Sequence, residues 1–278
     1  MPRFKLTIEY AGTRYSGWQI QKNARTVQGE IDRAVRAVTG RKDFELYGSG
    51  RTDAGVHALA QVAHLDVSTD LPAESLCRRI NQELPVDINL LAAAVVPHRF
   101  HARHDAVARA YLYQIARRRT ALAKAYVWWV KDPLDLQRTQ DAARVFVGMR
   151  DFKSFAEHVR GPRDDAQERS TLVRVERLDI AEDGDLVLVR IEGSHFLWKM
   201  VRRIVGVLVE VGRGVLKPPD AAALLAESSN VPARLTAPSS GLFLTRVYYD
   251  GDAREAAFGA ATPLTSRYLF ASRIRVEN

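Results

Sequence analysis

Cysteine is almost absent from this chain of 278 residues, because Cys77 is the only one. A single thiol can form no disulfide within the chain and no zinc site of several cysteines, which argues against an oxidising compartment. Long apolar runs are missing too, and no stretch approaches the ~20 residues of a membrane span. The first residues are charged from Arg3 onward and lack the apolar core of a signal peptide. We therefore expect a cytoplasmic protein without a membrane segment.

Acidic residues are fewer than basic ones, with 33 Asp and Glu against 41 Lys and Arg, and the formal net charge is +8. The hydrophobic fraction of 46% and the charged fraction of 27% are ordinary for folded proteins. A basic surface suits a polyanionic partner such as nucleic acid, although many basic proteins bind none. Charge alone leaves both interpretations equally open.

The hydrophobic periodicity predicts two series of strands and helices. Residues 4–10 alternate like a strand with one buried face, and residues 26–38 carry apolar side chains at helical spacing with Thr26 as N-cap. The first series continues with a strand at 61–67, a helix at 73–81 and a strand at 87–96. The second has strands at 111–115, 171–180, 186–192 and 242–249, and helices at 136–149, 195–212 and 221–227.

This order predicts an α/β protein with two related lobes, residues 1–105 and 106–250, and a cleft between them. The turn between the strands at 171–180 and 186–192 is expected at Asp183-Gly184. Residues 251–278 form a C-terminal extension to which the sequence assigns no role.

A glycine-rich loop, Gly48-Ser-Gly-Arg-Thr-Asp-Ala-Gly55, is the strongest local feature. Glycines there allow backbone conformations and close approaches that side chains forbid, as a rigid functional loop or a tight connection between strands would need. A phosphate-binding loop is disfavoured because the Lys-Ser or Lys-Thr ending is missing. An aspartic-protease loop is disfavoured because the chain holds no second copy.

Arg51 and Asp53 stand two residues apart, so on an extended loop both side chains can point to the same side. A cation close to Asp53 keeps its carboxylate ionised, as a nucleophile or general base must be. Arg51 could contact phosphate or fill the space left by an extruded base. The plainer alternative is a solvated surface pair.

Residues 50–58, Gly-Arg-Thr-Asp-Ala-Gly-Val-His-Ala, resemble the catalytic signature of the tRNA pseudouridine synthase A family. The similarity spans residues 4 to about 249. It includes the segments at 8–19, 26–28, 100–103, 109–113, 196–206 and 237–244.

The resemblance implies a pseudouridine synthase fold, in which a mixed, largely antiparallel sheet flanked by helices carries a central active-site cleft. It implies isomerisation of uridine in the anticodon stem-loop of tRNA, around positions 38 to 40, by a homodimer without metal or organic cofactor. Asp53 would be the catalytic carboxylate, Arg202 its partner across the cleft and Tyr111 the ring against the flipped base. Arg51 and Leu244 would help to bind the substrate.

Several basic side chains are candidate phosphate contacts, because charge can hold a folded RNA by its backbone. A solvated surface is an equally good interpretation for each. They are Lys22, Arg25, Arg103, Arg117 and Arg118. Residues 157–169, which include Arg160 and Arg163, are longer than the corresponding loop of the family.

His98, His101 and His104 recur every third residue but have no convincing carboxylate or cysteine partners, so no metal site is predicted. Two other functions remain in view. An RNA-binding module without catalysis would have little reason to hold Arg51, Asp53, Tyr111 and Arg202 together. A hydrolase should show a second acid, a metal triad or a nucleophile with its base, and the sequence offers none.

Overall fold

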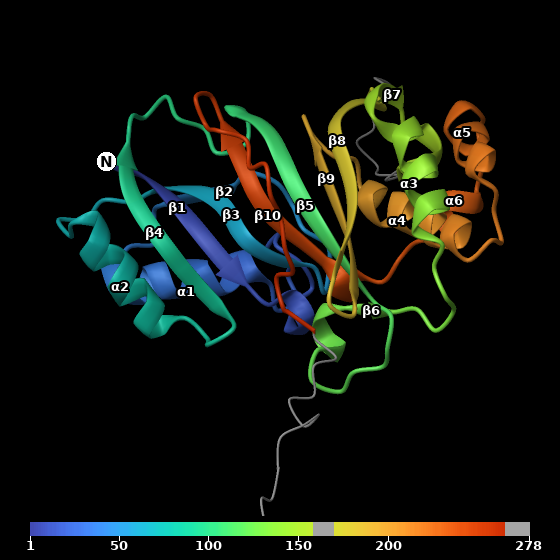
Figure 1. Cartoon of the computed structure of the whole chain (residues 1–278). Helices are drawn as coiled ribbons and strands as arrows, with labels where there is room; N and C mark the ends of the chain where they lie inside the picture. The colour runs from blue at the N-terminus through green and yellow to red at the C-terminus, as the bar shows by residue number, and fades with distance from the viewer. Residues whose placement is uncertain (158–169, 265–278) are drawn as a thin grey trace, which may run out of the picture.

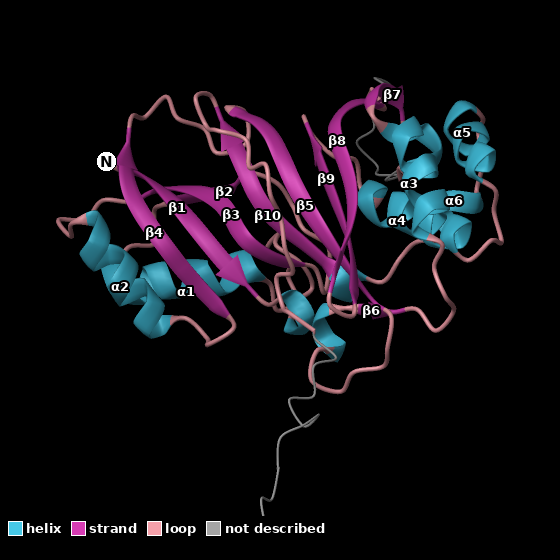
Figure 2. Ribbon diagram, viewed as in Figure 1, coloured by secondary structure: helices cyan, strands magenta, loops and turns pink. Residues whose placement is uncertain are grey.

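The computed structural model describes residues 1–157 and 170–264, and within these ranges a sheet of ten strands runs through the molecule (Figures 1 and 2). The strands are β1 (Arg3–Tyr10), β2 (Glu45–Gly48), β3 (His57–Asp66), β4 (Ile88–Val96), β5 (Ala106–Ala116), β6 (Trp128–Trp129), β7 (Gly148–Asp151), β8 (Leu172–Asp183), β9 (Leu186–Gly193) and β10 (Leu242–Tyr249). The α-helices are α1 (Val27–Thr39), α2 (Ala73–Glu83), α3 (Leu136–Ala143), α4 (Met200–Gly212), α5 (Pro218–Ala226) and α6 (Val231–Arg234). No helix in the described part of the chain is long and apolar enough to cross a membrane.

The strand order is β4-β1-β3-β10-β5-β9-β8-β7, with β2 paired to β3 and β6 to β5. Two pairings are parallel, β10 with β3 and β5 with β6, and the others are antiparallel. This arrangement confirms the mixed, largely antiparallel sheet. The last strand, β10, lies between strands of the two halves of the sequence, with Leu244 opposite both Ala58 and Tyr111.

The helices form two groups along the sheet (Figure 2). Helices α1 and α2 lie beside β1 and β4, while α3 to α6 lie at the β8 end. Each group closes a separate hydrophobic core, and the partly buried Tyr111 packs against both cores. The division of the chain into lobes at residue 105 stays a prediction, because one sheet serves both halves.

Helix α1 illustrates how closely periodicity predicts local structure. Thr26 is the N-cap, and its hydroxyl accepts a hydrogen bond from the Gly29 backbone at 3.2 Å. Its apolar stripe, which includes Ile31 and Val35, is buried against β1. At the other end Gly40 takes the left-handed conformation, with φ of 67°, which stops the helix.

The helix expected at residues 136–149 ends six residues early. Helix α3 stops at Ala143, and a single 3₁₀ turn follows at Arg144–Phe146. Gly148, with φ of 100°, then redirects the chain into β7, which pairs with the start of β8. The prediction was wrong there because the buried Phe146 continues the helical spacing without continuing the helix.

The described part of the C-terminal extension, residues 251–264, runs across the face of the sheet opposite the helices (Figure 1). Phe258, Ala261 and Leu264 cover the apolar face of β5, β9 and β10 there. The buried amide of Gln114 holds this segment, because its oxygen accepts the Ala261 backbone N–H at 2.8 Å. Residues 251–264 therefore cover part of the sheet face that lies opposite the helices.

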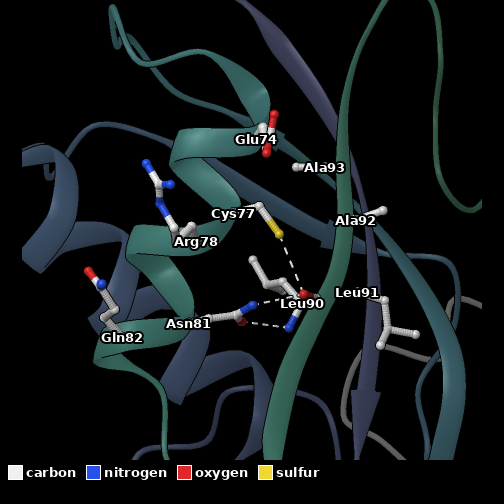
Figure 3. Close-up of a pocket in the computed structure, with 9 residues that line it drawn as sticks. All are labelled: Glu74, Cys77, Arg78, Asn81, Gln82, Leu90, Leu91, Ala92 and Ala93. Carbon is white, nitrogen blue, oxygen red and sulfur yellow. Dashed lines mark hydrogen bonds between the residues drawn. The ribbon is translucent and has the colours of Figure 1, made fainter.

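Strand β4 is an edge strand, and α2 packs beside it. The Asn81 side chain satisfies both backbone groups of Leu90, accepting from its N–H at 2.7 Å and donating to its carbonyl at 2.8 Å. Figure 3 shows the groove that remains between α2 and β4, with Cys77 and Leu91 among its lining residues. The Cys77 thiol lies against the Leu90 carbonyl, and burial raises its pKa.

Candidate active site

The loop between β2 and β3 carries Asp53, and backbone hydrogen bonds fix it to residues 15–18. The Trp18 N–H donates to the Thr52 carbonyl at 3.1 Å, and the Gly55 N–H donates to the Tyr15 carbonyl at 3.3 Å. A third bond closes the turn itself, from the Val56 N–H to the Asp53 carbonyl at 3.1 Å. The position of Asp53 is thus set by main-chain atoms of the N-terminal half.

Two features of this region explain its residue types. Gly17 has a φ of 93°, and a Cβ on it would lie 2.6 Å from the Thr52 carbonyl oxygen, so only glycine fits. Thr52 turns inward, where its hydroxyl pairs with the buried Tyr10 hydroxyl at 2.8 Å. With Thr52 anchored inside, its neighbour Asp53 points outward.

Both carboxylate oxygens of Asp53 have partners from the other half of the chain. Trp198 donates its indole N–H to Oδ1 at 3.0 Å, and Arg202 donates from Nη1 to Oδ2 at 3.3 Å. The Arg202 guanidinium is itself oriented, because Nε donates to the Ala237 carbonyl at 2.7 Å. The side chains of Asp53 and Arg202 are 23% and 16% exposed, so this ion pair is sheltered yet reachable.

Residues 194–199 present Trp198 to Asp53 and lead into α4, which carries Arg202. They were expected to open a helix at 195, but α4 begins at Met200, and Lys199 stands before it with a φ of 62°. A left-handed lysine costs about 1–2 kcal/mol, and its neighbours hold it there. The Lys199 ammonium pairs with Glu157 at 2.8 Å, and the Glu157 N–H donates to the Trp198 carbonyl at 3.1 Å.

Trp198 is a candidate site residue that the sequence did not indicate. Apolar periodicity placed it on a helix, where nothing would distinguish it from a packing residue. Trp198 is 44% exposed, which is high for a tryptophan. Its ring borders the ion pair of Asp53 and Arg202. No pattern in the sequence signals that its N–H meets Asp53.

Tyr111 and Leu244 lie side by side in the central strands β5 and β10. Leu244 is buried, and the Tyr111 ring meets Phe196 edge to face with 5.2 Å between ring centroids. Burial is the main reason that the pKa of Tyr111 is raised to about 12; Arg109 opposes the shift and Asp53 adds to it. The hydroxyl makes no hydrogen bond with any residue that the structure describes, so it is a neutral group available to a ligand.

Arg51 does not meet Asp53. The turn closed by the Val56 N–H lies at residues 53–56, after Arg51, and Arg51 Nε donates to the Gln19 side-chain oxygen at 3.1 Å. That both side chains point to one side stays a prediction, and the cation that pairs with the carboxylate is Arg202.

The candidate RNA contacts differ in their surroundings. Arg103 is exposed and lines a small pocket together with Arg51. Lys22 is exposed, and Arg25 pairs with Glu30 at 2.6 Å. Arg117 and Arg118 follow β5 and pair with acidic residues near the β8–β9 turn. Contact with RNA stays a prediction for all five.

Among residues 1–157 and 170–264, no three or more His, Cys, Asp or Glu side chains gather as a metal site would require. His101 and His104 instead pack against each other at a tilt of 45°, with 4.2 Å between ring centroids. His57, in the glycine-rich signature, accepts the Gly12 N–H at Nδ1 over 3.1 Å. Burial lowers the pKa of His57, and its ring ties the end of the Asp53 loop to Gly12.

Comparison with known proteins gives consistent matches. The family described as tRNA pseudouridine synthase matches residues 6–105 and 142–250. The tRNA pseudouridine synthase A of Rhodopseudomonas palustris is 41% identical over 253 residues, which cover 90% of this chain and 100% of the relative. The tRNA pseudouridine synthase A 2 of Clostridium tetani is 36% identical over 250 residues, covering 88% and 98%.

A solved Cbf5-Nop10-Gar1 complex is a far more distant match. It shares 11% identity with this chain at a TM-score of 0.31, covering 74% of this chain and 54% of the other.

Proposed function

This chain belongs to the tRNA pseudouridine synthase A family, and we propose that it isomerises uridine to pseudouridine in the anticodon stem-loop of tRNA, around positions 38 to 40. The observation that carries this proposal is the Asp53 carboxylate, which is held between Trp198 and Arg202 beside the central strands. An ionised carboxylate next to an aromatic ring is what the chemistry on an extruded base requires.

The reaction breaks the bond between C1′ of the ribose and N1 of uracil, turns the base, and forms a bond from C1′ to C5. The C5 proton leaves to solvent and N1 regains a proton, so atoms and electrons balance and no redox partner is needed. Asp53 starts the sequence in one of two ways. It attacks C1′ as uracil leaves, giving an ester that C5 of the uracil displaces, or it removes a proton from C2′ as uracil leaves, giving a glycal, and returns that proton to C2′ when C5 bonds to C1′. Both routes need an ionised carboxylate.

Arg202 stabilises that ionised carboxylate through the ion pair at 3.3 Å. Tyr111 offers its ring to the flipped uracil from the floor of the site. With a pKa of about 12, its hydroxyl is a phenolate in only about one molecule in 10⁵ at pH 7, so Tyr111 acts as a neutral ring and not as an ionised base. The Arg51 side chain, bonded through Nε to Gln19, contacts the RNA strand in this proposal.

The test is release of tritium from C5 of a tRNA transcript made with [5-³H]uridine, because the C5–H bond breaks in every turnover. The purified protein should release tritium in the presence of EDTA. Binding of the transcript without any release would favour an RNA-binding module in place of the enzyme.

We also propose that the protein is a homodimer located in the cytoplasm. Support for the dimer comes from β4, an edge strand whose nine residues carry no charge and which exposes Leu91 and Val95. Asn81 occupies the backbone groups of Leu90, so pairing would use the later part of this edge, around Val95, and the same edge from a second copy completes a symmetric interface. A Val95→Lys variant should lower the mass measured by light scattering to that of one chain; an unchanged dimer would place the interface elsewhere.

A further inference from the structure

Beside the Asp53 loop lies a second pocket, of about 140 Å³, that the chemistry described above does not use. Gly50 and Arg51 of the catalytic loop form one wall, and Trp18, Tyr47 and Arg103 contribute from other segments. The pocket is therefore adjacent to the site of the target uridine, on the same loop.

The floor of this pocket holds an unpaired donor. Trp18 is 1% exposed, and its indole N–H has no acceptor among the described residues. Gly48 packs directly against this ring, since a Cβ on Gly48 would lie 2.6 Å from the Trp18 indole nitrogen. This N–H faces the pocket that Trp18 lines, so it can donate a hydrogen bond to an acceptor on a ligand.

The acceptors that border the pocket are already occupied. The Gln28 oxygen accepts from the Gln19 amide at 2.8 Å, and the Gln19 oxygen accepts from Arg51 Nε at 3.1 Å. The Gly50 carbonyl accepts from the Gln61 amide at 3.1 Å. No Asp or Glu lines the pocket.

What remains is a set of donors with two positive charges. Arg51 uses Nε on Gln19 but makes no hydrogen bond through its terminal nitrogens within the described residues, and Arg103 is exposed at the rim. The Tyr47 hydroxyl likewise has no partner in the described part of the chain. A cavity with donors, cations and no free acceptor selects an anion that presents several oxygens.

We propose that this pocket binds a backbone phosphate of the RNA next to the target uridine, with Trp18, Tyr47, Arg51 and Arg103 as its donors. The inference rests on the proposed function, because it takes RNA as the ligand. A phosphate fixed here holds the strand on the loop that carries Asp53, so it positions the ribose while the base turns. In this arrangement the terminal nitrogens of Arg51 bind the RNA phosphate while its Nε stays bonded to Gln19. This accounts for the absence of a bond between Arg51 and Asp53 within the described residues.

The experiment uses hairpin RNAs of the anticodon stem-loop in which single phosphates are replaced by neutral methylphosphonates. Binding is measured with the Asp53→Asn variant, so that no turnover intervenes. One replacement next to the target uridine should weaken binding roughly 10- to 100-fold, the value of hydrogen bonds to a charged group. A replacement in the distant stem should not show this loss.

The decisive step is a thermodynamic cycle that combines a protein substitution with the methylphosphonate replacement in the RNA. Arg103→Gln or Tyr47→Phe, added to Asp53→Asn, should weaken binding of the natural hairpin and shrink the penalty of that one methylphosphonate. Arg99→Gln, a neighbouring exposed arginine outside the pocket, is the matched control and should leave the penalty unchanged. A penalty that stays equal in all variants would overturn the inference.

Binding of inorganic phosphate is measured to distinguish an RNA backbone phosphate from free phosphate as the ligand of this pocket. If it binds the pocket while no methylphosphonate position matters, the pocket is a free-phosphate site and the inference is wrong. Tritium release by the otherwise unchanged protein is measured in parallel. Release without the variant-dependent penalty removes only this inference, whereas absence of release removes the proposed function itself.

Discussion

Asp53 is held from two sides that work differently. The N-terminal half fixes the loop through backbone hydrogen bonds to residues 15–18, and Thr52 turns inward to Tyr10. The C-terminal half reaches the carboxylate only through the side chains of Trp198 and Arg202. The first side therefore sets where the carboxylate stands, and the second sets its charge and orientation. Changes on the first side should cost stability, and changes on the second should cost rate.

The largest loss of rate is expected for a change of Asp53 itself, which both sides contact. Asp53→Asn should lower the rate of tritium release by roughly 10⁴-fold or more, as removal of a reacting group does. The amide is the same size and can still accept from Trp198, so the thermal unfolding midpoint should stay the same. Substantial remaining turnover would remove Asp53 from the mechanism.

Arg202→Ala tests the second side alone. Losing the cation and its bond at 3.3 Å should lower the single-turnover rate by about 10²- to 10³-fold, with little change in the RNA dissociation constant. Arg202→Lys keeps the charge but not the planar geometry that also reaches Ala237, so it should recover part of the rate. Equal rates for the Ala and Lys variants would contradict a role for the charge.

Gly17→Ala tests the first side. The new Cβ would lie 2.6 Å from the Thr52 carbonyl oxygen at a φ of 93°, so the loop must shift. We expect a loss of about 2–3 kcal/mol in the free energy of unfolding, measured by urea denaturation. Gly40→Ala, also at positive φ but with open space around it, is the control and should lose less. Comparable losses for both would show that close packing on Thr52 is unimportant.

A smaller effect is expected for Trp198→Phe, which keeps a ring but removes the N–H bonded to Oδ1 at 3.0 Å. One hydrogen bond to a charged group predicts a loss in rate of roughly tenfold. Trp128→Phe, a tryptophan packed against the core, is a matched control that should leave the rate constant unaltered. A normal rate for Trp198→Phe would reduce Trp198 to a bystander.

The smallest effect is expected from pH. Because the pKa of Tyr111 is raised to about 12, its phenolate grows tenfold per pH unit throughout the range from 8 to 10. If that phenolate were the base, the rate would rise in parallel. We expect a flat profile, since the neutral ring does the work, and Tyr111→Phe should retain more activity than Tyr111→Leu. A slope near one would assign the C5 proton to Tyr111.

The sequence predicted one side of the site better than the other. The signature at residues 50–58 identified Asp53, and the family resemblance of residues 196–206 supplied Arg202, which the structure pairs with it. Strands such as β1 followed from alternation, because one face is buried and the other is not. These features depend on residues close together in the chain.

The remainder depends on contacts between distant segments. Lys199 adopts a left-handed conformation that no local pattern announces, and this alone moved the start of α4 from residue 195 to residue 200. Arg51 turned to Gln19 because the loop closes on residues 15–18. Likewise, the packing of residues 251–264 on the second face of the sheet has no signature in their small, irregular sequence. Tertiary context decided each of these.

The most direct test of the central claim is to map pseudouridine by position in an unmodified tRNA transcript after incubation with the purified protein. The account predicts pseudouridine in the anticodon stem-loop, around positions 38 to 40, with the wild-type chain and none with Asp53→Asn. Pseudouridine elsewhere in the transcript, or none despite tight binding, would contradict it.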